Sequence, residues 1–133
     1  MSEPTTLPAR RTIAVLFGGR SLEHDVSVVS GLQILHGLDP DRFAPLPIYI
    51  DHASRWWAGD DLWHNEAFKG GGPDRSRLVE VQLAPGFGSS ALVPVDVGAM
   101  VAAFGGAVTG VARGAGGSIP VDVFVPVLHG SYG

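Results

Sequence analysis

The chain has 133 residues, the usual size of a single domain with one hydrophobic core. Its net charge of −4 disfavours nucleic-acid binding, because nucleic acids attract clustered Lys and Arg. The absence of cysteine excludes disulfides, thiolate nucleophiles and thiolate zinc sites. No apolar run approaches the ~18 residues of a membrane span, and residues 1–12 lack the apolar core of a signal peptide. We therefore expect a cytoplasmic protein without membrane contact.

The first predicted elements are a polar leader and a buried strand. Residues 1–11 are polar, contain two prolines and are expected to be flexible. Residues 12–17 (TIAVLF) are continuously apolar and end at Gly18 and Gly19. A run that does not alternate predicts a strand buried on both faces, as in parallel sheets.

A helix is predicted next, with Ser21 as its N-cap and Leu38 near its end. Gly37 and Pro40 supply the stop signals. One apolar stripe at helical spacing is formed by Val28, Leu32 and Leu35. Residues 43–50 (FAPLPIYI) predict a second strand, whose early prolines suit an edge or irregular position. Residues 12–50 thus predict a strand–helix–strand unit with parallel strands.

The middle of the chain predicts an antiparallel insertion. Residues 55–64 (RWWAGDDLWH) place aromatics on both sides of Gly-Asp, which favours a hairpin with the three tryptophans in its core. Residues 78–84 and 91–95 predict further strands. Residues 98–117 are nearly all Gly, Ala and Val, a composition that favours neither a helix nor a strand.

Residues 121–128 (VDVFVPVL) predict a second buried parallel strand, followed at once by His129. A parallel sheet without a covering helix after its last strand is incomplete, so we expect a piece of a longer protein. Ligands of open parallel sheets bind outside the carboxyl ends of the strands. Glu23 and His129 follow two such strands, and adjacent parallel strands would place both residues on one rim.

The glycine turn resembles a phosphate-binding loop, but GGRSLE lacks the G-x-G-x-x-G spacing of dinucleotide-binding proteins. The carboxylate of Glu23 in the first helical turn would repel a phosphate, so an ammonium group is the better partner. On the residues alone, the favoured role of Glu23 is to complement the helix dipole, and that of His129 is to cap a backbone carbonyl.

Two segments carry a family resemblance. Residues 13–31 (IAVLFGGRSLEHDVSVVSG) closely resemble the amino-terminal motif of the D-alanine–D-alanine ligases. Residues 123–133 (VFVPVLHGSYG) resemble the beginning of a second motif of that family. The Trp-rich middle is similar to the longer subtype, and EHDVSV also occurs in relatives that make D-alanyl-D-lactate.

The resemblance implies an α/β fold: a Rossmann-like pre-ATP-grasp domain over residues 12–133, with the ATP-grasp domains outside the chain. It implies a homodimeric enzyme that uses ATP and Mg²⁺ (or Mn²⁺) to join two D-alanines for peptidoglycan through an acyl phosphate. Glu23 matches the catalytic-site glutamate that anchors the ammonium of the first D-alanine. Val26 matches a wall for the substrate methyl group, and His129 matches a residue lining the same pocket.

Two alternatives remain at this stage. One is another ATP-grasp carboxylate–amine ligase with a different amine substrate, and the other is a nucleotide-binding regulatory or redox module with a Rossmann-like fold. The chain alone is expected to be inactive, since it contains no Walker loop and ends before the rest of the second motif.

Overall fold

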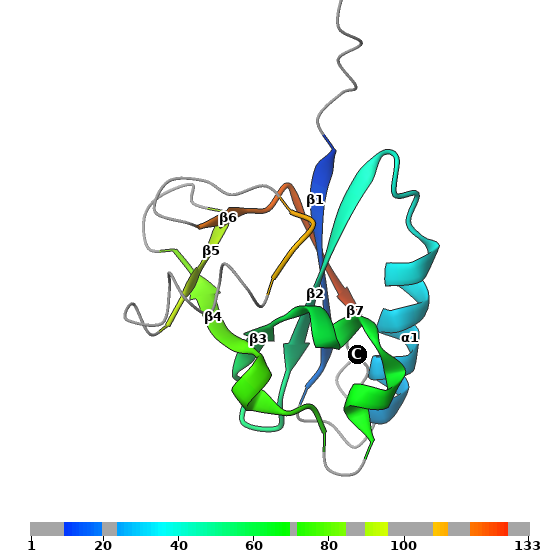
Figure 1. Ribbon diagram of the computed structural model, residues 1–133, viewed down its shortest axis with the longest axis vertical. Coiled ribbons are helices and arrows are strands. Elements are labelled where there is room, and N and C mark those ends of the chain that lie inside the picture. Colours follow the sequence, from blue (N-terminus) through cyan, green and yellow to red (C-terminus); the bar gives the residue numbers. More distant parts are fainter. Residues whose placement is uncertain are drawn as a thin grey trace, which may run out of the picture.

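A computed structural model describes residues 10–19, 24–69, 72–84, 90–95, 108–111 and 118–127. Within these residues the chain forms one mixed sheet in the order β6-β5-β4-β3-β2-β1-β7, with helix α1 against one face (Figure 1). The strands are β1 Arg11–Gly18, β2 Phe43–Ile50, β3 Trp56–Ala58, β4 Val79–Leu83, β5 Ala91–Pro94, β6 Ile119–Pro120 and β7 Val123–Val127. The helices are α1 His24–Gly37 and the 3₁₀ turns η1 Asp60–Trp63, η2 Asn65–Phe68 and η3 Arg75–Arg77.

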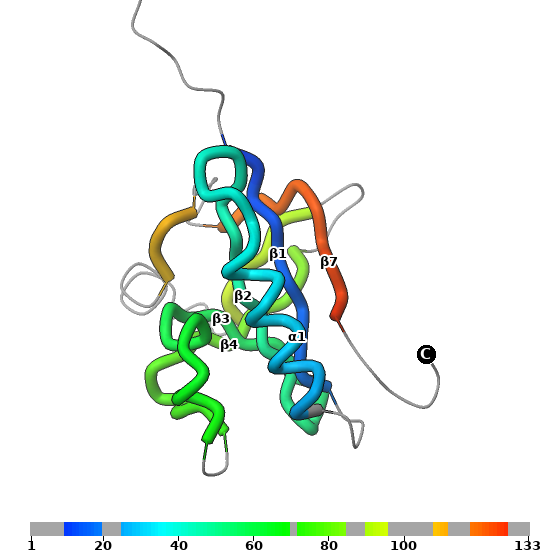
Figure 2. Tube along the Cα trace, turned by 90° about the vertical axis from the view of Figure 1, so that its right-hand side faces the viewer, coloured from blue at the N-terminus to red at the C-terminus, as the bar shows by residue number. Residues whose placement is uncertain are grey.

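The parallel part of the sheet consists of β2, β1 and β7. Strand β1 lies between the other two and pairs with both in parallel, from Arg11↔Phe43 and from Ile13↔Val123. Figure 2 shows α1 in front of β1, with β7 running beside that strand. The strand–helix–strand prediction is confirmed, as is the parallel pairing of the strand that precedes His129. The carboxyl ends of the three strands consequently lie along one edge of the sheet.

The two prolines of β2 cost the sheet no hydrogen bond, because their backbone nitrogens face away from β1. Gly19 N–H donates to the carbonyl of Ile50 on β2 at 2.8 Å, so the even-numbered residues of β2 present their backbone groups to β1. Pro45 and Pro47 therefore direct their missing N–H away from β1. On that side β3 pairs with β2 only from Ile48 onward, so neither proline removes a hydrogen bond from the ladder.

The predicted hairpin at 55–64 is wrong in position. Strand β3 pairs on one side with β2 and on the other with β4, and after Gly59 the chain enters η1 instead of returning. The antiparallel turn lies one strand earlier, at residues 51–55. Asp51 is buried there, and its carboxylate accepts N–H bonds from Ala53 at 2.8 Å and Arg55 at 3.0 Å. A side-chain acceptor, which the hydrophobic pattern does not register, determines the turn.

The strands separate two hydrophobic cores. The core on the α1 face includes Val15 and Phe17 of β1, together with the predicted helical stripe of Val28, Leu32 and Leu35. The opposite core is formed by even-numbered residues of β1 and β2 and by the antiparallel strands. The three tryptophans are divided between the two cores and are only partly buried, with Trp56 on one side and Trp57 and Trp63 on the other.

Other differences concern the ends of elements. Helix α1 is described from His24, and the predicted N-cap Ser21 lies outside the described residues. Strand β7 is at one end of the order and Val123 is 42% exposed, so the prediction of a fully buried strand is wrong. Residues 1–9 and most of 98–117 also lie outside the described residues. In the part described, no helix has the length and apolar character needed to cross a membrane.

Candidate functional site

The glycine turn at the end of β1 has a backbone that favours glycine at both positions. Gly18 and Gly19 have φ angles of 101° and 97°, in the left-handed region that side chains disfavour. A Cβ on Gly18 would overlap the carbonyl oxygen of Ile50 and approach the Tyr49 ring to 3.0 Å. The turn therefore needs glycine at position 18 both for conformation and for space beside β2.

Ser27 joins the carboxyl ends of β1 and β7 from the first half of α1. Its side chain is fully buried. The N–H of Gly18 donates to Ser27 Oγ at 2.9 Å, and the Ser27 hydroxyl donates to the carbonyl of Val127. One hydroxyl thus links the last residue of β1 to the last residue of β7. These are the two strands that lead toward Glu23 and His129.

Of the three predicted site residues, the structure describes one. Val26 lies near the start of α1, and 55% of its surface is exposed. An exposed apolar side chain beside the strand ends is available to contact a ligand. Glu23 and His129 lie outside the described residues, so their roles stay predictions. The structure describes the strands that precede them, which end side by side in parallel.

Tyr49 lies beside the glycine turn, at the carboxyl end of β2. Its ring belongs to an aromatic cluster with Phe17 and Phe68, at centroid distances of 6.2 and 5.4 Å. Burial raises the pKa of the Tyr49 hydroxyl, and the negative charges of Asp51 and Asp25 raise it further, against an opposing effect of Arg75. Tyr49 is therefore a neutral phenol at physiological pH and contributes no charge to this edge of the sheet.

Ser27, Tyr49 and Asp51 were not singled out by the sequence reasoning. Ser27 directly precedes Val28 of the apolar stripe, but a serine within a helix by itself indicates a polar surface position, so its burial had no clear signal in the sequence. Asp51 directly follows a strand, where aspartate commonly accepts hydrogen bonds from the following turn. Tyr49 lies within an apolar run and gave no signal of its position at the strand ends.

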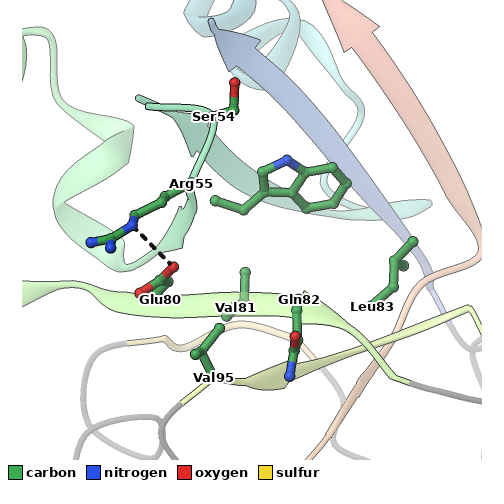
Figure 3. Close-up of a pocket in the computed structure, with 8 residues that line it drawn as sticks. Ser54, Arg55, Glu80, Val81, Gln82, Leu83 and Val95 are labelled. Carbon is green, nitrogen blue, oxygen red and sulfur yellow. Dashed lines mark ion pairs between the residues drawn. The ribbon is translucent and has the colours of Figure 1, made fainter. Parts of the chain in front are cut away.

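A hollow of about 380 Å³ lies on the antiparallel part of the sheet (Figure 3). Its polar groups include Arg55 and Glu80, which pair with each other at 3.8 Å between Arg55 Nε and Glu80 Oε2. Trp56 lines it and belongs to the core opposite α1. Val26, the predicted site residue that the structure describes, is not among the residues lining this hollow.

The described residues hold no group of three or more His, Cys, Asp or Glu side chains placed to bind a metal ion. His36 instead stacks edge-on against Trp63, and its Nε2 lies 3.0 Å from the Trp63 carbonyl oxygen. His52 and His64 are exposed.

Comparison with known proteins identifies what the chain is similar to. The family model described as D-ala D-ala ligase N-terminus matches residues 12–133. A D-alanine–D-alanine ligase of Methylobacterium sp. (strain 4-46) is 38% identical over 124 residues, covering 93% of this chain and 27% of the relative. One from Mycobacterium ulcerans (strain Agy99) is 35% identical over 137 residues, covering 100% of this chain and 33% of the relative. The chain therefore spans about a third or less of these relatives.

Solved structures show the same fold at low sequence identity. The D-alanine–D-alanine ligase from Coxiella burnetii has a TM-score of 0.64 at 23% identity, covering 95% of this chain and 30% of that one. The VanG D-Ala:D-Ser ligase from Enterococcus faecalis has a TM-score of 0.63 at 23% identity, covering 90% and 29%. The mixed α/β sheet described above is thus similar to the corresponding part of these structures.

Proposed function

The chain belongs to the D-ala D-ala ligase N-terminus family, and from this premise we propose that it is the amino-terminal, substrate-binding domain of an ATP-dependent D-alanine–D-alanine ligase. The full-length enzyme would form D-alanyl-D-alanine for peptidoglycan. The family match and relatives named as such ligases at 35–38% identity support this function. They do not favour the alternative of a nucleotide-binding redox module.

In this proposal residues 12–133 form a Rossmann-like pre-ATP-grasp domain, preceded by a leader over residues 1–11. The parallel β2-β1-β7 arrangement with α1 on one face supports that description. The remaining ATP-grasp domains would lie outside this chain. We further propose a homodimeric, cytoplasmic enzyme.

The first D-alanine would bind at the carboxyl ends of β1 and β7. Glu23 would accept hydrogen bonds from the substrate ammonium, Val26 would contact its methyl group, and His129 would donate to its carboxylate oxygens. The observation that carries this proposal is the parallel pairing of β1 with β7, extending to Phe17↔Val127. The segments that lead to Glu23 and His129 therefore leave the sheet as neighbours, at the edge where such folds bind ligands.

ATP and Mg²⁺ (or Mn²⁺) would be bound by the domains outside this chain. The described residues do not fit a metal: Asp51, the most buried carboxylate among them, is engaged by backbone N–H groups and by Arg75 at 3.3 Å. The contribution of this domain is to bind and orient an amino acid. It would bring the carboxylate of that amino acid to the site of activation.

The test is ADP release by the full-length enzyme, measured against a panel of D- and L-amino acids. We expect turnover with D-alanine and none with L-alanine, and D-alanyl-D-alanine as the product. Turnover only with another amine acceptor would identify a different carboxylate–amine ligase. No ATP-dependent ligation of any amino acid would refute the proposal.

A further inference from the structure

The β1–β7 pair is held at both ends by a side chain. At the amino end, Asp122 Oδ2 accepts the Thr12 N–H at 2.7 Å, and the Asp122 N–H donates to the Thr12 carbonyl at 2.9 Å. At the carboxyl end, Ser27 links Gly18 and Val127. Thr12 and Gly18 are both even-numbered residues of β1, so both direct their backbone groups toward β7.

Ser27 occupies the place of a backbone hydrogen bond. Continuing the register beyond Phe17↔Val127 would direct the Gly18 N–H at the Val127 carbonyl. The Ser27 hydroxyl lies in that path, accepts from Gly18 and donates to Val127. A hydroxyl has one proton to donate and lone pairs to accept with, so one side chain satisfies both backbone groups. Ser27 thereby determines how far apart the two strands end.

The chain passes from β1 to β2 on one side and reaches β7 on the other, so the sheet changes its direction of growth between β1 and β7. Open α/β sheets bind ligands in the crevice at this switch point, outside the carboxyl ends of the strands. Ser27 separates the strands at the mouth of that crevice. A helix-borne hydroxyl is a rigid spacer here, because α1 is packed against β1.

We propose that Ser27 is a positioning residue for the first amino acid substrate, inserted between β1 and β7 so that the segments carrying Glu23 and His129 leave the sheet at the separation the substrate needs. This inference rests on the proposed function. Ser27 itself does not touch the substrate in this account. It acts through the Gly18 amide and the Val127 carbonyl.

The test compares Ser27→Ala with Asp122→Ala in the full-length ligase. Both variants weaken the β1–β7 pair, but only Ser27→Ala does so at the ligand end. We expect kcat/KM for the first D-alanine to fall about tenfold in Ser27→Ala, because small displacements of a bound substrate are costly, while KM for ATP is unchanged. Asp122→Ala should keep both constants within about twofold of the wild type.

A double-mutant cycle separates positioning from general destabilisation. Because Ser27 acts through the segments of Glu23 and His129, Ser27→Ala in a background carrying Glu23→Gln and His129→Ala should lower kcat/KM by less than about twofold further. The same tenfold loss in both backgrounds would overturn the proposal. If the alanine variant does not fold, Ser27→Cys keeps the shape of the side chain with a somewhat larger atom, weakens both hydrogen bonds and should lower kcat/KM about threefold.

The outcomes distinguish this inference from the proposed function. If the wild type ligates D-alanine and the folded Ser27 variant does so with unchanged kinetics, the positioning role of Ser27 is overturned and the proposed function is kept. Absence of ligation in the wild type overturns both. Loss of activity in Asp122→Ala equal to that in Ser27→Ala would reduce Ser27 to a structural residue of the strand pair.

Discussion

Gly31 of α1 lies directly against Phe17 of β1: a Cβ built on Gly31 would stand 2.7 Å from the Phe17 Cβ. Real Cβ atoms do not approach side chains so closely, so this glycine sets the distance between the helix and the sheet. Phe17 is fully buried and immediately precedes the glycine turn. The position of α1, and with it that of Ser27, therefore depends on the absence of a side chain at Gly31.

Gly31→Ala is expected to lower the free energy of unfolding by about 1–3 kcal/mol, because a methyl group forced into a packed contact moves the helix outward. Gly37→Ala is the matched control in the same helix, since a Cβ there meets nothing within 4 Å. It should be neutral or stabilise the chain by up to about 1 kcal/mol through helix propensity. Urea denaturation of both variants measures the difference. Equal effects would contradict the close-contact explanation.

Local patterns predicted the parallel part of the fold well. The apolar run before Gly18 and the stripe of Val28, Leu32 and Leu35 depend on burial between neighbouring elements, which periodicity reports directly. The hairpin was misplaced because the Asp51 carboxylate, and not the Gly-Asp pair, organises the turn. The exposure of β7 follows from its place at one end of the strand order, which no local pattern contains.

Asp51 is expected to stabilise the fold at neutral pH and to lose that effect in acid. Burial alone would raise the pKa of Asp51, but hydrogen bonds from Arg55 N–H, the Trp57 indole and Ala53 N–H, with the charge of Arg75, lower it. A carboxyl group whose pKa is lowered by folding contributes stability above its unfolded pKa of about 4. That contribution is lost as the pH falls through the folded pKa.

Asp51→Asn tests this because the asparagine retains an oxygen acceptor for the turn but removes the charge. It also replaces one carboxylate oxygen by an amide nitrogen, whereas in the wild type Trp57 Nε1 donates to Asp51 Oδ2 at 3.0 Å. At pH 7 the variant should unfold with a free energy about 1–3 kcal/mol below the wild type. The difference should narrow below about pH 4. Urea titrations at several pH values give both quantities, and a difference that is constant across that range would contradict the account.

Gly18→Ala should destabilise the chain more than Gly72→Ala. Both glycines have a φ of 101°, so both substitutions carry the same conformational strain. Only the alanine at position 18 would also overlap the Ile50 carbonyl, whereas the nearest atom to a Cβ on Gly72 is the Tyr49 hydroxyl at 3.8 Å. We expect about 1 kcal/mol for Gly72→Ala and at least about 3 kcal/mol for Gly18→Ala, measured by thermal and urea unfolding. Losses of equal size would show that space beside β2 is not limiting.

The edge of the sheet that carries the candidate site could be predicted from the order of the strands. The hydrogen bonds by which Ser27 links β1 to β7 at this edge could not. A serine within a helix indicates a polar surface position when the sequence is considered alone. The Ser27 side chain is buried because it meets the carbonyl of Val127, 100 residues further along the chain. Such a contact exists only after β1 and β7 have become neighbours.

The most direct measurement is the KM for the first D-alanine in the full-length ligase carrying Glu23→Gln, with Glu66→Gln, an exposed glutamate of η2, as control. Loss of the charged partner of the ammonium should remove about 2–3 kcal/mol of binding, and so raise this KM about 30- to 150-fold, with KM for ATP unchanged. Glu66→Gln should behave as the wild type. A KM for the first D-alanine within about twofold of the wild type in Glu23→Gln would contradict the account.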